Sequence, residues 1–153
     1  MSAAEQVFLD TNVLVYAHDR GEPVKGSLAV ALLGRLFLAG TPAVSIQVFS
    51  EFYQTVTRKL SAPLSHQEAA DELRRFRQLT RVVSLDWAVL ERAVGTIQIH
   101  SLSLWDAQIH AAAKEAGSLF ILSEDFQHRR VLDGVIYLNP FAVDFDITEI
   151  LPP

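Results

Sequence analysis

Short apolar runs alternate along this chain with longer segments in which apolar residues recur every three or four positions. The short runs predict β-strands, and the longer periodic segments predict amphipathic helices. The predicted strands are 7–9, 43–46, 81–85, 119–122 and 135–138, and the predicted helices are 13–17, 23–38, 47–60, 65–79, 86–100 and 104–116. Apolar strands that alternate with helices are typical of a parallel sheet covered on both faces. We therefore expect an α/β fold, a three-layer α/β/α sandwich with a mainly parallel central sheet.

Local signals define several of the predicted helix ends. Ser65 and Glu68 have the spacing of a capping box, in which each side chain bonds to the backbone N–H of the other residue. Ser103 and Asp106 have the same spacing at the start of the last helix, and Gly117 follows its end. The tail 144–153 is acidic and partly apolar, and the sequence leaves open whether it adds an edge strand or stays loose.

Composition points to one domain that spans residues 1–153. The chain has 153 residues, 50% of them hydrophobic, and it contains no Gly/Ser-rich linker, low-complexity tract or internal repeat. A chain of this length buries roughly 70% of its unfolded surface, which is enough for one core. No signal peptide is visible, and the longest apolar stretch is too short to span a membrane. We therefore expect a cytoplasmic protein.

Charge and residue types narrow the possible chemistry. The chain carries 18 acidic and 13 basic side chains, a net charge of −5, which argues against a generic basic nucleic-acid binder. It has no cysteine, and its five histidines form no His-x-x-x-His pair, so a zinc site is not expected. Any bound metal is expected to be a hard ion that prefers oxygen ligands. Acidic residues gathered around such an ion would make the net charge a poor guide to the field at the site.

Four acidic residues fall where predicted strands end or predicted helices begin. Asp10 and Asp125 follow strands, and Glu51 lies in the second turn of the helix after another strand. Asp106 lies in the first turn of a helix that runs antiparallel to the next strand, so this helix starts at the same sheet edge. Ligands of parallel sheets bind beyond the carboxyl ends of the strands. Because four carboxylates there would repel one another unless a cation held them, the sequence predicts a divalent-metal site.

Each acid also has an ordinary structural interpretation. Asp10 fits a helix N-cap, and Asp106 fits a capping box with Ser103. Glu51 fits a solvated helix residue, and Asp125 fits a turn residue. Taken one at a time these interpretations dominate, but the shared location of the four acids favours the metal site.

Four segments contain these acids, and a fifth follows them near the end of the chain: Phe8-Leu9-Asp10-Thr11-Asn12-Val13-Leu14-Val15-Tyr16, Ser45-Ile46-Gln47-Val48-Phe49-Ser50-Glu51-Phe52, Leu104-Trp105-Asp106-Ala107, Ile121-Leu122-Ser123-Glu124-Asp125-Phe126 and Leu138-Asn139-Pro140-Phe141. In this order they closely resemble PIN domains and, more narrowly, the VapC toxin ribonucleases of bacterial and archaeal toxin–antitoxin pairs. The resemblance covers nearly the whole chain. Matched by position, the acidic metal-binding residues of the family correspond to Asp10, Glu51, Asp106 and Asp125, and its supporting polar positions to Asn12 and Ser123.

The resemblance implies a metal-dependent endoribonuclease that hydrolyses RNA phosphodiester bonds, the toxin of a VapBC-type pair. A carboxylate-held Mg²⁺ or Mn²⁺ would lower the pKa of a bound water and neutralise charge on the phosphoryl oxygens. Asp10 and Asp106 would be the main metal ligands, with Asp125 as a direct or water-mediated ligand, and Glu51 would be a second ligand or the base that orients water. The resemblance also implies a homodimer and a VapB-like antitoxin that lies across the active site. The number of metal ions and the RNA target stay open.

Positive charge for holding RNA is sparse in this sequence. The three arginines of the predicted helix 65–79 are expected to form a solvated face, whereas Arg129 and Arg130 lie close in sequence to Asp125. His110 lies one turn after Asp106 and could pair with it or contact phosphate, but an exposed helix histidine is the expectation.

Two other functions compete with the nuclease. A non-catalytic PIN-fold module could bind RNA or a protein without cutting, but all four acids are present. A phosphatase of the haloacid-dehalogenase type needs a second Asp two residues after the first, where this chain has Asn12.

Overall fold

A computed structural model describes all 153 residues of the chain. Six strands form one sheet in the order β3-β2-β1-β4-β6-β5. The strands are β1 (Val7–Leu9), β2 (Ala43–Ser45), β3 (Arg81–Val83), β4 (Phe120–Leu122), β5 (Val131–Leu132) and β6 (Val135–Leu138). Every neighbouring pair is parallel except β5 and β6, which are antiparallel. The predicted mainly parallel sheet is confirmed.

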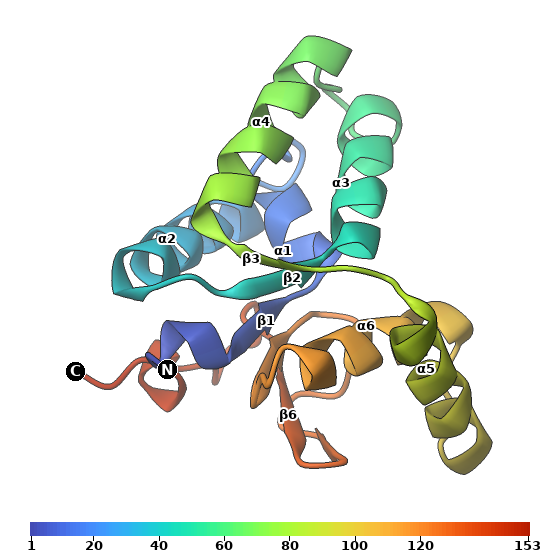
Figure 1. Cartoon of the computed structure of the whole chain (residues 1–153). Helices are drawn as coiled ribbons and strands as arrows, with labels where there is room; N and C mark the ends of the chain where they lie inside the picture. The colour runs from blue at the N-terminus through green and yellow to red at the C-terminus, as the bar shows by residue number, and fades with distance from the viewer.

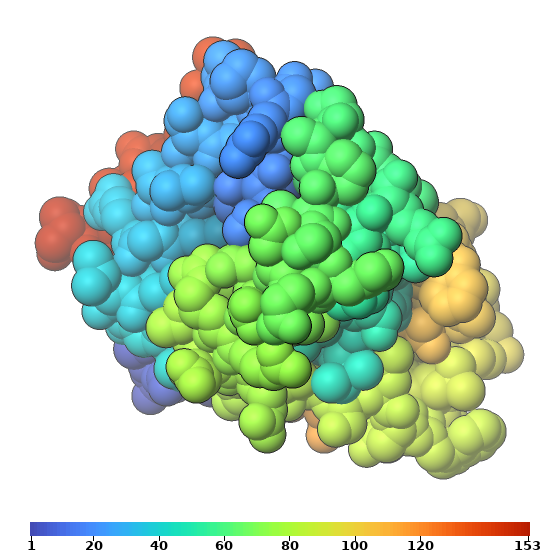
Figure 2. Space-filling model, turned by 90° about the horizontal axis from the view of Figure 1, so that it is seen from above, coloured from blue at the N-terminus to red at the C-terminus, as the bar shows by residue number.

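Helices cover both faces of this sheet, with α1 to α4 on one face and α5 and α6 on the other (Figure 1). The helices are α1 (Thr11–Tyr16), α2 (Pro23–Ala39), α3 (Ile46–Arg58), α4 (His66–Leu79), α5 (Trp87–Ile99) and α6 (Leu104–Glu115), and short 3-10 helices occupy η1 (Ala4–Gln6) and η2 (Ile147–Glu149). Viewed from above, α4 lies in the middle of its face with α2 on one side, while α5 and α6 appear at the opposite margin (Figure 2). This is the predicted α/β/α sandwich. None of the helices combines the length and the apolar character needed to cross a bilayer.

The central strands are apolar because both of their faces are covered. β1 is fully buried, and its Phe8 lies beside Ala43 of β2. The rings of Phe52 in α3 and Phe76 in α4 meet edge to face with centroids 5.4 Å apart, a geometry that adds about 1 kcal/mol to the burial itself. This packing holds α3, the helix that carries Glu51, against α4.

The helix ends follow the predicted capping signals in part. The capping box of Ser65 and Glu68 is complete, with hydrogen bonds of 3.1 Å and 2.7 Å. Ser103 accepts a hydrogen bond from the backbone N–H of Asp106 at 3.1 Å, but the Asp106 carboxylate does not reach back. The backbone of Gly117 has a φ of +70°, the left-handed conformation that ends α6.

The sequence interpretation missed the hairpin formed by β5 and β6. Asp133 and Gly134 connect the two strands, with φ values of +47° and +79°. Two successive positive φ values are typical of a type I′ turn, for which Asp-Gly is a favoured sequence. The signal was therefore present, but two residues of strand are too few to show a hydrophobic pattern.

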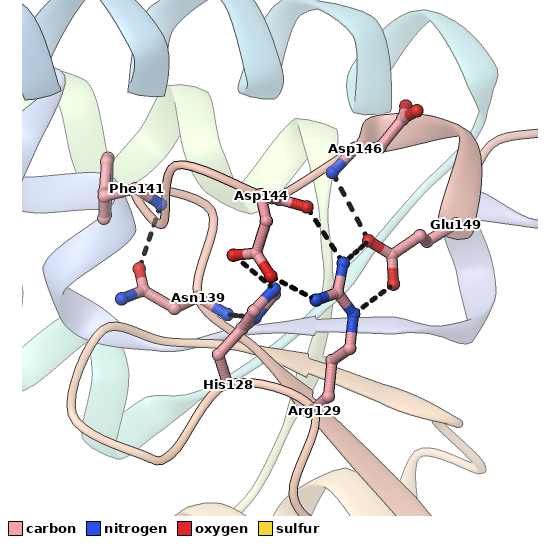
Figure 3. Close-up of polar contacts among 7 residues, drawn as sticks. All are labelled: His128, Arg129, Asn139, Phe141, Asp144, Asp146 and Glu149. Carbon is pink, nitrogen blue, oxygen red and sulfur yellow. Dashed lines mark hydrogen bonds and ion pairs between the residues drawn. The ribbon is translucent and has the colours of Figure 1, made fainter.

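The tail is neither an edge strand nor a loose end. Ile150 and Leu151 are buried, and η2 lies just before them. Arg129, from the loop after β4, makes four hydrogen bonds to Asp144 and Glu149 (Figure 3). Arg129 has a φ of +64°, which costs a non-glycine residue about 1 kcal/mol, so these bonds hold a strained residue as well as the tail.

Candidate carboxylate site

Asp10 connects the central strand to the first helix. It caps α1, because its carboxylate accepts a hydrogen bond from the backbone N–H of Thr11 at 2.7 Å. Its own backbone N–H donates to the carbonyl oxygen of Leu122 at 3.0 Å, so Asp10 lies beside the end of β4. The side chain is only 5% exposed. The helix cap and the buried acid are therefore the same residue.

Ser123 joins two of the predicted acids. Its hydroxyl donates to Asp10 Oδ2 at 2.7 Å and accepts from the backbone N–H of Asp125 at 3.1 Å. The amide of Asn12 donates both to Ser123 Oγ and to Asp125 Oδ2, each at 3.2 Å. The side chains of Asp10, Asn12, Ser123 and Asp125 thus form one hydrogen-bonded group at the carboxyl ends of β1 and β4.

Glu51 is held by residues from two helices. Its Oε2 accepts from the hydroxyl of Thr11 at 2.6 Å, and its Oε1 accepts from the amide of Gln47 at 2.8 Å. Gln47 is buried and also donates to the carbonyl oxygen of Trp105 at 3.3 Å. Glu51 is half-buried, not a freely solvated helix residue. Sequence reasoning missed Thr11 and Gln47, although Gln47 lies four residues before Glu51, the spacing that puts two side chains on one helix face.

Asp106 is the least connected of the four acids. It is half-exposed in the first turn of α6, and its carboxylate accepts no hydrogen bond. Gln47 links Glu51 to the carbonyl of the preceding residue, Trp105, so the start of α6 lies beside the group. The structure therefore connects Asp10, Asp125 and Glu51 through polar contacts and brings Asp106 close without bonding it.

The two strand-end acids are harder to ionise than an ordinary aspartate. Burial, with smaller contributions from the negative charges of Asp125 and Glu51, raises the pKa of Asp10 to about 6, although the hydrogen bonds from Ser123 and Thr11 lower it. Partial withdrawal from water also raises the pKa of Asp125, with contributions from Glu124, Asp106 and Glu51. Negative charges on neighbouring acids thus contribute to the raised pKa of both Asp10 and Asp125.

The donor atoms suit a hard divalent cation. Mg²⁺ in proteins is usually held by one or two carboxylates, with water and substrate phosphate as the other ligands. Three or more acidic or histidine side chains do not stand close enough here to enclose an ion among themselves. The carboxylate oxygens fit Mg²⁺ or Mn²⁺ bound in this open manner, and their mutual repulsion favours a cation.

The basic residues singled out in the sequence are mostly engaged elsewhere. Arg129 is paired with Asp144 and Glu149 and does not face the carboxylates as an unpaired charge. His110 is 1% exposed, so the expectation of an exposed histidine was wrong. Its Nδ1 lies 2.6 Å from the hydroxyl of Tyr137, and burial lowers its pKa to about 4, which keeps it neutral.

Comparison with known proteins adds a family. The sequence matches the PIN domain family over residues 7–133. This range includes all four acids and both supporting residues. No curated protein matches the sequence.

Three solved structures have a similar fold. A toxin–antitoxin complex from Klebsiella pneumoniae has a TM-score of 0.64 and 17% identity, over 90% of this chain and 99% of that chain. VapBC2 from Rickettsia felis, in a structure bound to a DNA fragment from the promoter, has a TM-score of 0.61 and 15% identity, over 86% of this chain and 96% of that chain. VapC20 from Mycobacterium tuberculosis, a sarcin–ricin loop cleaving toxin, has a TM-score of 0.58 and 20% identity, over 75% of this chain and 86% of that chain. At these identities the likeness is one of fold.

Proposed function

This chain belongs to the PIN domain family, and on that premise we propose that it is a metal-dependent endoribonuclease, the toxin of a VapBC-type toxin–antitoxin pair. PIN domains are typically nucleases and generally bind Mg²⁺. The similar folds of VapC toxins support the narrower assignment.

The observation that carries the proposal is the buried carboxylate of Asp10 beside two other acids. A buried carboxylate with a pKa near 6 is costly to a fold, and neighbouring charges from Asp125 and Glu51 add to that cost. Strongly perturbed groups of this kind cluster at functional sites. A bound divalent cation would relieve the repulsion.

We assign metal binding to Asp10 and Asp106, with Asp125 as a further ligand that acts directly or through water. When bound, Mg²⁺ or Mn²⁺ supplies Lewis-acid activation of water and of the phosphoryl oxygens. Ser123 and Asn12 hold the carboxylates of Asp10 and Asp125 in fixed positions.

Glu51 has a different role in this proposal. Thr11 and Gln47 each donate a hydrogen bond to one of its oxygens, so the carboxylate is oriented before substrate arrives. A carboxylate fixed in this way can orient an attacking water or accept its proton.

Cleavage of a mixed cellular RNA sample tests the function. The purified chain is expected to cut RNA with Mg²⁺ or Mn²⁺ and to stop when EDTA is added. Asp10→Asn should reduce the cleavage rate by at least about 100-fold, because an amide replaces a carboxylate that binds metal. Asp86→Asn is the matched control, because Asp86 is the N-cap of α5 as Asp10 is the N-cap of α1. Asp86 is not one of the four acids of the candidate site.

Three results would count against this proposal. Cutting that persists in Asp10→Asn would exclude the carboxylate site, and equal losses in both variants would mean that the change acts through folding. A chain that binds Mn²⁺ and RNA but cuts nothing in the mixture would instead be a non-catalytic PIN-fold module.

The proposed partners are a VapB-like antitoxin and a second copy of the chain. Two of the similar structures belong to toxin–antitoxin assemblies. The apolar side chains of α2 support a contact surface, because Leu32 and Leu36 enter the core while Val24, Val30 and Leu38 are exposed. Sedimentation equilibrium distinguishes a monomer of 17.0 kDa from a species of twice that mass. A monomer at all concentrations would remove the homodimer from the proposal.

A further inference from the structure

A cleft leads away from the carboxylates along α3. Its volume is about 510 Å³, and its walls include Asn12, Glu51 and Asp125 at one end and Thr55 and Lys59 at the other. The cleft is thus continuous with the proposed active site. A volume of this size holds a small part of a flexible chain and does not admit a double helix.

One face of α3 forms a wall of this cleft. Glu51, Thr55 and Lys59 are four residues apart, the spacing that places side chains above one another on a helix. With a rise of 1.5 Å per residue, Lys59 lies about 12 Å along the helix from Glu51. A substrate held at the carboxylates therefore passes Lys59 if it follows the cleft.

Lys59 is the only basic residue that lines the cleft. Its side chain is exposed and has no ion-pair or hydrogen-bond partner, whereas Lys25 is paired with Glu124 at 2.9 Å and Arg129 with two acids of the tail. Asp19 also lines the cleft, but its carboxylate accepts from the backbone N–H of Gly21 at 2.9 Å. On a chain of net charge −5, a free ammonium group beside an acidic site is a scarce attractor for a polyanion.

Lys59 also has an ordinary structural role to weigh. It ends α3, where its backbone N–H donates to the carbonyl of Thr55 at 2.8 Å, and a cation there interacts favourably with the helix dipole. Arg58 has the same advantage one residue earlier, yet it does not line the cleft. The dipole therefore explains a basic residue at this helix end but not why one points along the cleft.

We propose that Lys59 binds a backbone phosphate of single-stranded RNA in this cleft, at a distance from the phosphate that is cleaved. The proposal rests on the nuclease function proposed above and names the form of its substrate. Single strands are the RNA form whose backbone can enter a narrow cleft, and a lysine contact to phosphate is independent of base sequence.

RNA binding without cleavage tests this contact. Fluorescence anisotropy with a labelled single-stranded RNA of mixed sequence, in EDTA and over a series of KCl concentrations, gives the dependence of the binding constant on salt. Loss of one phosphate contact reduces the slope of log K against log salt by about 0.7 for single strands. Lys59→Gln is expected to show this reduction, while Lys59→Arg keeps the wild-type slope and Arg58→Gln, the matched control, leaves it unchanged.

Steady-state cleavage gives a second readout. Lys59→Gln is expected to raise KM by about 5- to 10-fold while kcat and Mn²⁺ affinity stay close to wild type, because the contact lies away from the reacting phosphate. Comparison of Lys59→Gln with Lys59→Arg separates loss of charge from loss of the helix end, and thermal melting confirms that each variant folds.

The outcomes distinguish this proposal from the nuclease itself. A reduced slope in Lys59→Gln supports the phosphate contact even if no preparation cuts RNA. Equal slopes in all variants, equal reductions in Lys59→Gln and Arg58→Gln, or no RNA binding by the wild type would overturn the contact. Metal-dependent cleavage together with equal salt slopes in all variants would overturn only the phosphate contact of Lys59 and would leave the proposed nuclease function in place.

Discussion

The pKa values of acidic side chains are shifted in opposite directions in two regions of this molecule. At the sheet edge, burial and like charges raise the pKa of both Asp10 and Asp125. In the tail, the guanidinium of Arg129 lowers the pKa of both Asp144 and Glu149 (Figure 3). Both regions flank the same loop after β4. The difference is the presence or absence of a cation supplied by the chain itself.

This difference distinguishes the tail, whose acids are neutralised by Arg129, from the sheet edge, whose acids have no cationic partner from the chain. Arg129 is only four residues beyond Asp125, yet its hydrogen bonds go to the tail. The acids at the sheet edge receive hydrogen bonds from neutral Ser, Thr and Asn groups, which orient carboxylates without neutralising them. Such an arrangement lowers stability and leaves the negative charge for an external cation, which is the usual relation between stability and a functional site.

Among the changes that test this comparison, removal of the Asp10 charge should have the largest effect on folding stability. The pKa of Asp10 is about 6 in the folded chain against an ordinary 3.8, so between these values the folded state holds a proton that the unfolded state has released. Stability therefore falls as pH rises through this window, by up to about 3 kcal/mol. Asp10→Asn is expected to unfold at higher urea concentration than wild type at pH 7 in EDTA, with the advantage shrinking toward pH 4.

The tail acids provide the control with the opposite sign. Their pKa values are lowered, so they stabilise the fold above their ordinary pKa values, and this contribution is lost as the pH falls through the lowered values. The double variant Asp144→Asn, Glu149→Gln should therefore be less stable than wild type at pH 7 and approach it below about pH 4. If both variants changed stability in the same direction at pH 7, the contrast between the two regions would be wrong.

The sequence predicted the sheet edge better than the contacts around it. Asp10 and Asp125 could be located because a residue that follows a buried strand reaches the carboxyl edge of a parallel sheet whatever its neighbours are. The role of each acid in the reaction stays a prediction. The partners of Arg129 could not be foreseen, because Asp144 and Glu149 meet it only after the tail folds back over the chain.

Other errors have similar physical causes. His110 is buried because it lies on the face of α6 that packs against the sheet, where its Nδ1 is within hydrogen-bond distance of the Tyr137 hydroxyl. No local pattern reports which face of a largely apolar helix meets the sheet. The hairpin of β5 and β6 was different, since its Asp133-Gly134 turn is a local signal that was overlooked. Local signals thus predict elements and their ends, whereas side-chain partners depend on packing between distant segments.

A comparison of two buried serines tests a smaller effect, the contribution of the Ser123 hydroxyl to holding the carboxylates in place. Ser123 Oγ bonds to Asp10, Asn12 and the backbone of Asp125, whereas Ser118 Oγ is buried with no partner. Ser123→Ala should cost about 2 kcal/mol in urea unfolding, because it leaves two donors without an acceptor, and should slow RNA cleavage by roughly 10- to 100-fold. Ser118→Ala should leave cleavage unchanged and be neutral or slightly stabilising, because it removes an unpaired polar group. Equal losses of activity in the two variants would mean that Ser123 matters for packing and not for holding the carboxylates.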